Sequence, residues 1–192
     1  MPLWSWLLLA LFTLPAAGLL YQCIGLRRDR RRFPPPGRFV TLDSGLRLHL
    51  AATGHGPAVW LEAGLAASSV GWRPVANAFV NAGFRVLAID RAGYGWSDPP
   101  RTPRSLENLL GELRQAVIAS GAPLPLIMAG HSFGGLLLRH YAALYPSDVA
   151  ALILLDPLEP SEFHPLSRFQ AARLRYGIRL SRRGAVLARF GV

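Results

Sequence analysis

The stretch LPLIMAGHSFGG, residues 124–135, decides the fold of this 192-residue chain. Its second half contains GHSFG, the pattern Gly-x-Ser-x-Gly, between an apolar run typical of a buried strand and a helical segment at 133–145. In that context the pattern forms a sharp turn that exposes the serine hydroxyl. We therefore predict that Ser132 lies at the tip of a strand, before a helix whose first N–H groups can stabilise an oxyanion.

The same alternation of apolar runs and amphipathic segments continues on both sides of this turn. Strands are predicted at 38–42, 46–52, 58–61, 84–89, 124–129 and 149–155, and helices at 74–81, 106–120 and 133–145. Short apolar strands that alternate with helices indicate an α/β fold, a mostly parallel sheet with helices on both faces. Ligands bind beyond the carboxyl ends of such strands, so the residues just after each run matter most.

Two further motifs accompany the turn at Ser132. Residues 90–98 read DRAGYGWSD and follow the strand predicted at 84–89, and residues 62–65 read EAGL. With GHSFGG, these motifs make the chain resemble the α/β-hydrolase fold superfamily over residues 38–160. DRAGYGWSD is similar to the loop after that family's fourth strand, and EAGL stands where many members have a His-Gly oxyanion loop.

The resemblance implies a serine hydrolase (esterase- or lipase-like) with named roles at the turn. Ser132 would be the nucleophile, and the backbone N–H groups of Phe133 and Leu65 would form the oxyanion hole, with Gly64 in the oxyanion loop. A nucleophilic serine implies an acyl-enzyme, hence hydrolysis of a small-molecule carboxylic ester, thioester, amide or C–C bond. It argues against relatives with a nucleophilic Asp, such as epoxide hydrolases and haloalkane dehalogenases. No metal or organic cofactor is expected.

Several polar and aromatic residues near these motifs are expected to serve structure. Glu62, which replaces the family's common His, is interpreted as a loop-supporting carboxylate that accepts backbone N–H bonds. Arg91 and Asp98 are expected to stabilise their own loop. Tyr94 and Trp96 either line a pocket or pack within that loop.

A serine nucleophile needs a histidine base that an acid orients. His131 is expected to point into the sheet or to support the turn, and His140 lies within the predicted helix. That leaves His164 as the candidate base and Asp156 as the candidate acid, although a loop cap is favoured for Asp156. The resemblance places the usual acid and base on two further strands beyond a lid. Residues 161–192 look like the start of that lid, so we expect an incomplete C-terminal part, an unpaired sheet edge and weak or no activity of this chain alone.

The N-terminus reads as a membrane anchor. Residues 3–26 carry no charged side chain, about the length that spans a bilayer as a helix. Five Arg residues follow at 27–32, which predicts a single-pass anchor with the bulk of the chain in the cytoplasm. The rival interpretation, a cleaved signal peptide, lacks the positive charge expected before the apolar run. The predicted organisation is an anchor at 1–26, an Arg/Pro-rich linker at 27–37, the hydrolase core at 38–160 and the lid at 161–192.

Charge and cysteine content exclude other classes of protein. The net charge of +10 comes from the ends, since 27–32 contribute +4, 168–192 contribute +7 and 33–167 contribute −1. A basic face on the globular part is therefore missing, and nucleic acid is not an expected partner. The basic amphipathic pattern of 168–192 fits a lid helix or an acidic membrane surface, and we favour the lid. One cysteine, Cys23, excludes an internal disulfide.

Three functional hypotheses remain. The first is a membrane-anchored serine hydrolase, and a native product longer than this chain would support it. The second is a noncatalytic binding or interaction module on a partial hydrolase fold, against which labelling of Ser132 by a phosphonate would count. The third is a short hydrolase that uses His164 and Asp156, against which esterase activity surviving His164→Ala would count. We favour the first.

Overall fold

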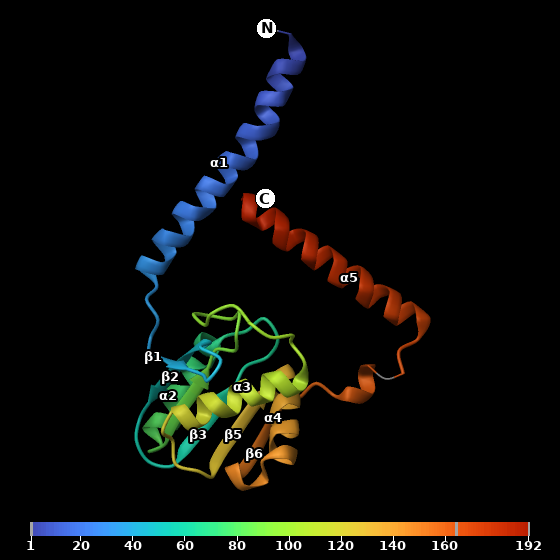
Figure 1. Cartoon of the computed structure of the whole chain (residues 1–192). Helices are drawn as coiled ribbons and strands as arrows, with labels where there is room; N and C mark the ends of the chain where they lie inside the picture. The colour runs from blue at the N-terminus through green and yellow to red at the C-terminus, as the bar shows by residue number, and fades with distance from the viewer. Residues whose placement is uncertain (1, 164, 192) are drawn as a thin grey trace. The chain divides into compact units, whose positions relative to one another are not determined.

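The computed structural model describes residues 2–163 and 165–191. The chain divides into a compact unit, Pro35–Glu162, and a second unit made of the two terminal segments. Six strands of the compact unit form one sheet in the order β1-β2-β4-β3-β5-β6 (Figure 1). The strands are β1 (Arg38–Thr41), β2 (Arg47–Thr53), β3 (Ala58–Glu62), β4 (Arg85–Ile89), β5 (Leu126–His131) and β6 (Val149–Leu155).

The prediction of a mostly parallel sheet is confirmed. β3 pairs in parallel with β4 and β5, and β5 pairs in parallel with β6. Only β2 runs the other way, since it pairs in antiparallel fashion with β1 on one side and with β4 on the other. The long helices of this unit are α2 (Arg73–Asn81), α3 (Leu106–Ala119) and α4 (Phe133–Leu144), each within one residue of its predicted bounds.

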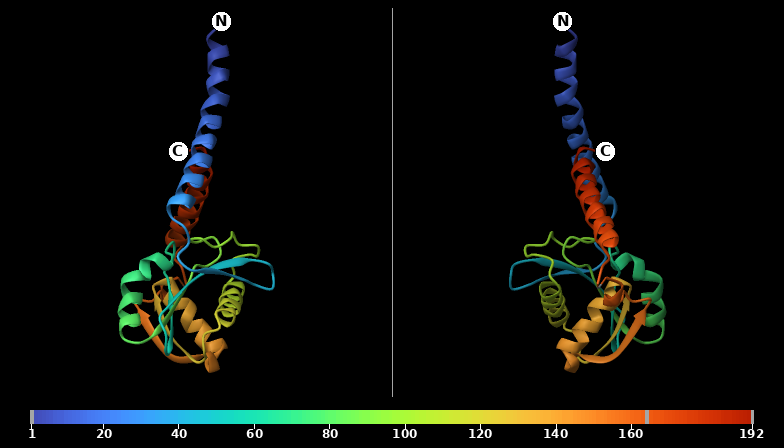
Figure 2. Two further views of the ribbon diagram at one scale, coloured as in Figure 1. Left: turned by 90° about the vertical axis from the view of Figure 1, so that its left-hand side faces the viewer. Right: turned by 90° about the vertical axis from the view of Figure 1, so that its right-hand side faces the viewer.

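Helices cover both faces of the sheet because β3 is apolar on both sides. All five of its residues are buried, and its side chains alternate between two clusters. Trp60 lies in the cluster with apolar residues of α3 and α4, whereas Val59 and Leu61 lie in the cluster that α2 covers. The result is a three-layer arrangement with α2 on one face and α3 and α4 on the other (Figure 2).

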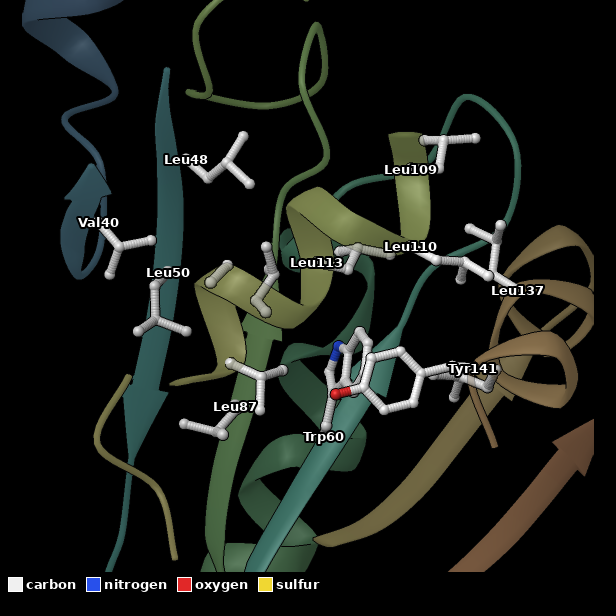
Figure 3. Close-up of a cluster of buried hydrophobic side chains, with 14 of the residues drawn as sticks. Val40, Leu48, Leu50, Trp60, Leu87, Leu109, Leu110, Leu113, Leu137 and Tyr141 are labelled. Atoms are coloured by element: carbon white, nitrogen blue, oxygen red, sulfur yellow. The ribbon is translucent and has the colours of Figure 1, made fainter. Parts of the chain in front are cut away.

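The larger core cluster centres on two aromatic rings (Figure 3). The rings of Trp60 and Tyr141 meet edge to face, with centroids 5.1 Å apart. The hydroxyl of Tyr141 donates a hydrogen bond of 3.0 Å to Asp148 Oδ2, to which Arg114 Nε also donates at 3.1 Å. The carboxylate thus fixes α4 through Tyr141 and α3 through Arg114.

β6 forms one edge of the sheet in the part of the chain that the structure describes. Its side chains Ile153, Leu154 and Leu155 are 39%, 38% and 42% exposed, although all three are large and apolar. An exposed apolar edge strand is a template for pairing with another strand.

The terminal unit contains two long helices, α1 (Leu3–Arg32) and α5 (Arg168–Leu187). α1 is long and apolar enough to cross a membrane, with a mean hydropathy of 1.9 in its most apolar window. It runs on through the Arg cluster that we assigned to the linker, because Arg is a good helix former and cations are favourable in a last turn. α5 begins with a capping box between Ser167 and Gln170, and none of its residues is buried.

We expect Tyr141→Phe to lower the free energy of unfolding by about 1–3 kcal/mol, because it removes one of the two donors to Oδ2 of the buried Asp148 carboxylate. Urea denaturation of the purified protein measures this change. Tyr145→Phe is the matched control, since the Tyr145 hydroxyl makes no hydrogen bond within the described residues, while its ring meets the Tyr141 ring edge to face and is kept in the variant. Equal stabilities of the two variants would contradict the role given to the Tyr141 hydroxyl.

Candidate active site

Three parallel strands bring the predicted site residues to one edge of the sheet. In register, Glu62 on β3 lies opposite Gly130 on β5, and His131 on β5 lies opposite Leu155 on β6. The loop after β3, the turn at Ser132 and the residues after β6 therefore lie side by side. This edge is the one at which ligands bind in open α/β sheets.

The backbone at Ser132 adopts the sharp turn that the motif predicts. Ser132 has φ 51° and ψ −119°, a conformation that non-glycine residues rarely adopt. Its N–H donates to the carbonyl oxygen of Leu155 at 3.1 Å, and its own carbonyl oxygen accepts from the N–H of Leu158 at 3.0 Å. The end of β6 therefore holds the turn from one side, and the half-buried Ser132 stands directly before α4.

Glycines around Ser132 allow the backbone segments to approach closely. A Cβ added at Gly134 would collide with the carbonyl oxygens of Glu62 and Ala63 at the end of β3. A Cβ added at Gly64 would lie 3.4 Å from Ser132 Cβ and 3.2 Å from His131 Nδ1. The first turn of α4 and the loop after β3 therefore meet at Ser132.

The two residues predicted to supply oxyanion donors are both near Ser132. Phe133 follows it in the chain, and the loop that contains Leu65 packs against it. Phe133 is the first residue of α4, and the first N–H groups of a helix lack an acceptor within the helix. Leu65 follows Gly64, and its side chain is 68% exposed while the loop backbone approaches Ser132.

The structure corrects the predicted partners of Glu62 and Arg91. Glu62 is fully buried and accepts hydrogen bonds from the guanidinium of Arg91 and, at 3.2 Å, from the indole of Trp60, rather than from backbone N–H groups. Arg91 was expected to stabilise its own loop, but its side chain crosses to the loop after β3. The reason is that only a carboxylate and carbonyl oxygens can balance a cation that is 3% exposed.

Burial raises the pKa of the Glu62 carboxyl to about 7, against the opposing charge and hydrogen bond of Arg91. Both carboxylate oxygens have donors, Oε1 from Arg91 and Oε2 from Trp60. The carboxylate is therefore a support for the loop and has no free oxygen with which to reach a substrate.

Asp98 closes the 90–98 loop onto a neighbouring strand. Its two carboxylate oxygens accept hydrogen bonds of 3.1 and 2.9 Å from the guanidinium of Arg47 on β2. This fork of donors holds the pKa of Asp98 below its ordinary value. The aromatic residues of the loop pack on its framework, since the Tyr94 ring lies 4.9 Å from the Arg91 guanidinium and the Trp96 ring 4.9 Å from the His49 ring.

The sequence analysis did not predict a buried His-Asp pair at the end of β4. His49 Nδ1 lies 2.9 Å from Asp90 Oδ2, and both side chains are fully buried. Burial alone would raise the pKa of Asp90, but hydrogen bonds from His49 and the N–H of Ser69 hold it below its ordinary value. The sequence alone does not show that His49 and Asp90 are neighbours. Their contact follows from the pairing of β2 with β4, in which the N–H of Asp90 donates to the carbonyl oxygen of His49.

That pair is not placed to serve Ser132. His49 Nε2 is buried and has no hydrogen-bond partner among the residues that the structure describes. β3 separates β4 from β5, so Asp90 and Ser132 follow strands that are not neighbours. The pair instead fixes the 90–98 loop, because Ser97 Oγ accepts from His49 N–H at 2.8 Å and donates to the Asp90 carbonyl.

The structure describes the candidate acid, Asp156, but not the candidate base, His164. Asp156 is exposed, has φ 44° and directly follows Leu155, the partner of His131 in the register. His164 lies outside the described residues. His140 lies half-buried on α4, and no described histidine hydrogen-bonds to the Ser132 hydroxyl.

A small cavity lies beside the turn. Its volume is about 190 Å³, and Gly64, Trp72 and His131 contribute to its walls together with small residues of the loop after β3. His131 is thus exposed beside this cavity rather than turned into the sheet. Within the described residues, no group of three or more His, Cys, Asp or Glu side chains could hold a metal ion.

Comparisons with known proteins agree with this geometry. The family model described as alpha/beta hydrolase fold matches residues 57–182. Bifunctional epoxide hydrolase 2 of Rattus norvegicus is 38% identical over 125 residues, which cover 64% of this chain and 22% of the rat protein. Across such relatives the chain spans about a fifth to a half of their length.

Solved structures give the same fold. Epoxide hydrolase A from Mycobacterium thermoresistibile superposes with a TM-score of 0.56 and 33% identity, over 61% of this chain and 37% of that chain. The thioesterase domain from the curacin biosynthetic pathway superposes with a TM-score of 0.58 and 27% identity, over 62% and 43%.

The raised pKa of Glu62 makes a prediction about stability. A carboxyl whose pKa rises from 4.5 to about 7 on folding stabilises the fold fully below pH 4.5 and loses that contribution as the pH rises to about 7. We expect the thermal midpoint of the wild-type protein to fall relative to that of Glu62→Gln between about pH 5 and about pH 8.

Differential scanning fluorimetry across this pH range measures the two midpoints. Glu112→Gln is the control, because it breaks the remote ion pair of Glu112 with Arg104 and leaves Glu62 in place. A constant difference between wild type and Glu62→Gln would show that the carboxyl does not titrate in this range.

Proposed function

Because this chain belongs to the α/β-hydrolase fold family, we propose that it is a membrane-anchored serine hydrolase that cleaves an ester-like bond through an acyl-serine intermediate. The observation that carries the proposal is the strained turn at Ser132, which stands directly before α4 while the loop after β3 packs against it. Strained backbone persists only where the surrounding structure enforces it, and it is typical of functional sites.

The proposed chemistry begins with attack of Ser132 Oγ on the carbonyl carbon of the substrate. The N–H groups of Leu65 and Phe133 stabilise the oxyanion of the tetrahedral intermediate. The general base takes the hydroxyl proton of Ser132 during the attack and passes it to the departing alcohol or thiol as the intermediate collapses, which leaves the acyl group on Ser132. Water then hydrolyses the acyl-enzyme and frees the acid product.

The identity of the residue at the turn favours esters over epoxides. Relatives of this chain carry the name epoxide hydrolase, and that chemistry uses an aspartate nucleophile, whereas this chain has Ser132. A serine hydroxyl acylated by an ester or thioester gives an intermediate that water can hydrolyse. The likeness to a thioesterase domain supports the same assignment.

The cavity beside Gly64 and His131 supports a small acyl group or leaving group. Its volume of about 190 Å³ is below the usual range for drug-sized ligands. Short-chain esters are therefore the substrates to test first.

The proposed anchor is α1. Its apolar window is 0% buried within the structure, and the Arg cluster at 27–32 follows it directly. Apolar side chains without a protein partner are stable in lipid, and the positive cluster favours the cytoplasmic side. The hydrolase unit would then lie in the cytoplasm next to the membrane.

The acid and the base remain part of the proposal. Asp156, beside the turn in the register of β5 and β6, is the candidate acid, and His164 follows it in the order Ser, Asp, His that this fold uses. The competing function, a noncatalytic binding module, has one observation in its favour, which is that no described histidine bonds to Ser132. Activity assays distinguish the two.

We expect the protein, purified from its own membranes, to hydrolyse short p-nitrophenyl esters, and Ser132→Ala to lower kcat by at least about 10³-fold. The loss follows because alanine keeps the turn but removes the nucleophile. Ser147→Ala, at a serine before β6 and away from the turn, is the control and should keep full activity. Hydrolysis that survives Ser132→Ala would refute the serine mechanism and favour a different nucleophile.

A further inference from the structure

We propose that Arg91 is a positioning residue that turns the backbone N–H of Leu65 toward the oxyanion formed at Ser132. This inference rests on the proposed function. It gives the buried Arg91–Glu62 pair a role in catalysis rather than in stability alone. Arg91 itself touches neither substrate nor reacting atoms.

The guanidinium of Arg91 holds three consecutive residues of the loop after β3. Nη1 donates to Glu62 Oε1 and, at 2.7 Å, to the carbonyl oxygen of Ala63. Nη2 donates to the carbonyl oxygen of Gly64, also at 2.7 Å. The two backbone carbonyls are thus fixed by one rigid, planar group.

Fixing a carbonyl also fixes the N–H on the other side of the same peptide bond. A trans peptide is planar, so its C=O and N–H point in opposite directions. The carbonyl of Gly64 shares its plane with the N–H of Leu65, which must therefore point away from Arg91. Because Gly64 packs directly against Ser132, this N–H is available to an atom bound to the serine.

The guanidinium is itself held in place from several sides. Its carbon lies 4.9 Å from the Tyr94 ring centroid and 5.5 Å from the Phe133 ring centroid. Glu62 supplies the counter-charge, and Trp60 holds the second oxygen of that carboxylate. A side chain that is 3% exposed and bound in this way has little freedom to rotate.

Stability alone does not account for this arrangement. A buried ion pair roughly balances its own desolvation cost, so its replacement by apolar residues is often neutral. Both Glu62 oxygens accept hydrogen bonds, and both terminal nitrogens of Arg91 donate to the segment that ends β3 and begins the following loop, so the pair is bound to that segment. What the pair does uniquely is to orient two peptide planes beside the nucleophile.

Arg91→Lys tests the inference, because lysine keeps the charge but cannot bond both carbonyls and Glu62 in a planar fork. We expect kcat on a short p-nitrophenyl ester to fall by roughly 100-fold, the effect of losing one oxyanion donor, with KM changed less than about threefold. Inhibition by a trifluoromethyl ketone, which forms an oxyanion on the serine, should weaken in parallel.

Arg114→Lys is the matched control. Arg114 also pairs with a carboxylate and lies 4.4 Å from an aromatic ring, but it joins α3 to Asp148 far from the turn. It should leave kcat and ketone inhibition unchanged. Glu62→Gln is a second variant that keeps Arg91 and removes its counter-charge, and we expect a smaller loss of kcat; it carries the test if Arg91→Lys does not fold.

The outcomes separate this inference from the function on which it rests. Wild-type hydrolysis that depends on Ser132, together with normal kcat and ketone inhibition in Arg91→Lys, would overturn the inference alone. Absence of Ser132-dependent hydrolysis in the wild-type protein would overturn the proposed function and the inference with it. A rise in KM without a fall in kcat would also count against a role of Arg91 in stabilising the transition state.

Discussion

The rest of the site depends on the backbone at Ser132, which turns sharply between β5 and α4 with φ 51°. Hydrogen bonds to the end of β6 hold this turn from one side, and the loop after β3 packs against it from the other. Neither contact tolerates a bulky residue, because a Cβ at Gly134 would meet backbone carbonyls at the end of β3 and a Cβ at Gly135 would meet Pro157 after β6. The glycines of the motif therefore serve close approach, and the strain places one hydroxyl before the N-terminus of a helix.

Buried charges organise the same edge of the sheet. Glu62 with Arg91, and His49 with Asp90, are pairs that lie at or next to strand ends and hold the loops that follow. The Glu62–Arg91 pair takes its charges out of water, at a cost that the ion pair itself only about offsets. The contribution of both pairs lies in geometry, since each fixes loop backbone through hydrogen bonds that an apolar pair could not make.

The strands and helices could be predicted from the sequence because the strands are short, apolar and separated by turn residues. All six strands and the three helices of the compact unit follow from these patterns, and the turn at Ser132 follows from its motif. The partners of Arg91 and His49 did not follow, because they depend on which strands are neighbours, and the order β2-β4-β3-β5 is not readable from periodicity. The end of α1 was also missed, since charge marks a membrane boundary rather than a helix boundary.

The most direct test of the central claim is covalent labelling of the native protein with a serine-directed phosphonate, followed by tryptic digestion and mass spectrometry. Trypsin cleaves after Arg114 and Arg139, so residues 115–139 form one peptide that contains Ser132. The proposed function predicts that the label is on Ser132, that it is stoichiometric, and that heat denaturation before labelling abolishes it. An unlabelled Ser132 in folded protein, or equal labelling of Ser120 in the same peptide, would contradict an activated nucleophile at this turn.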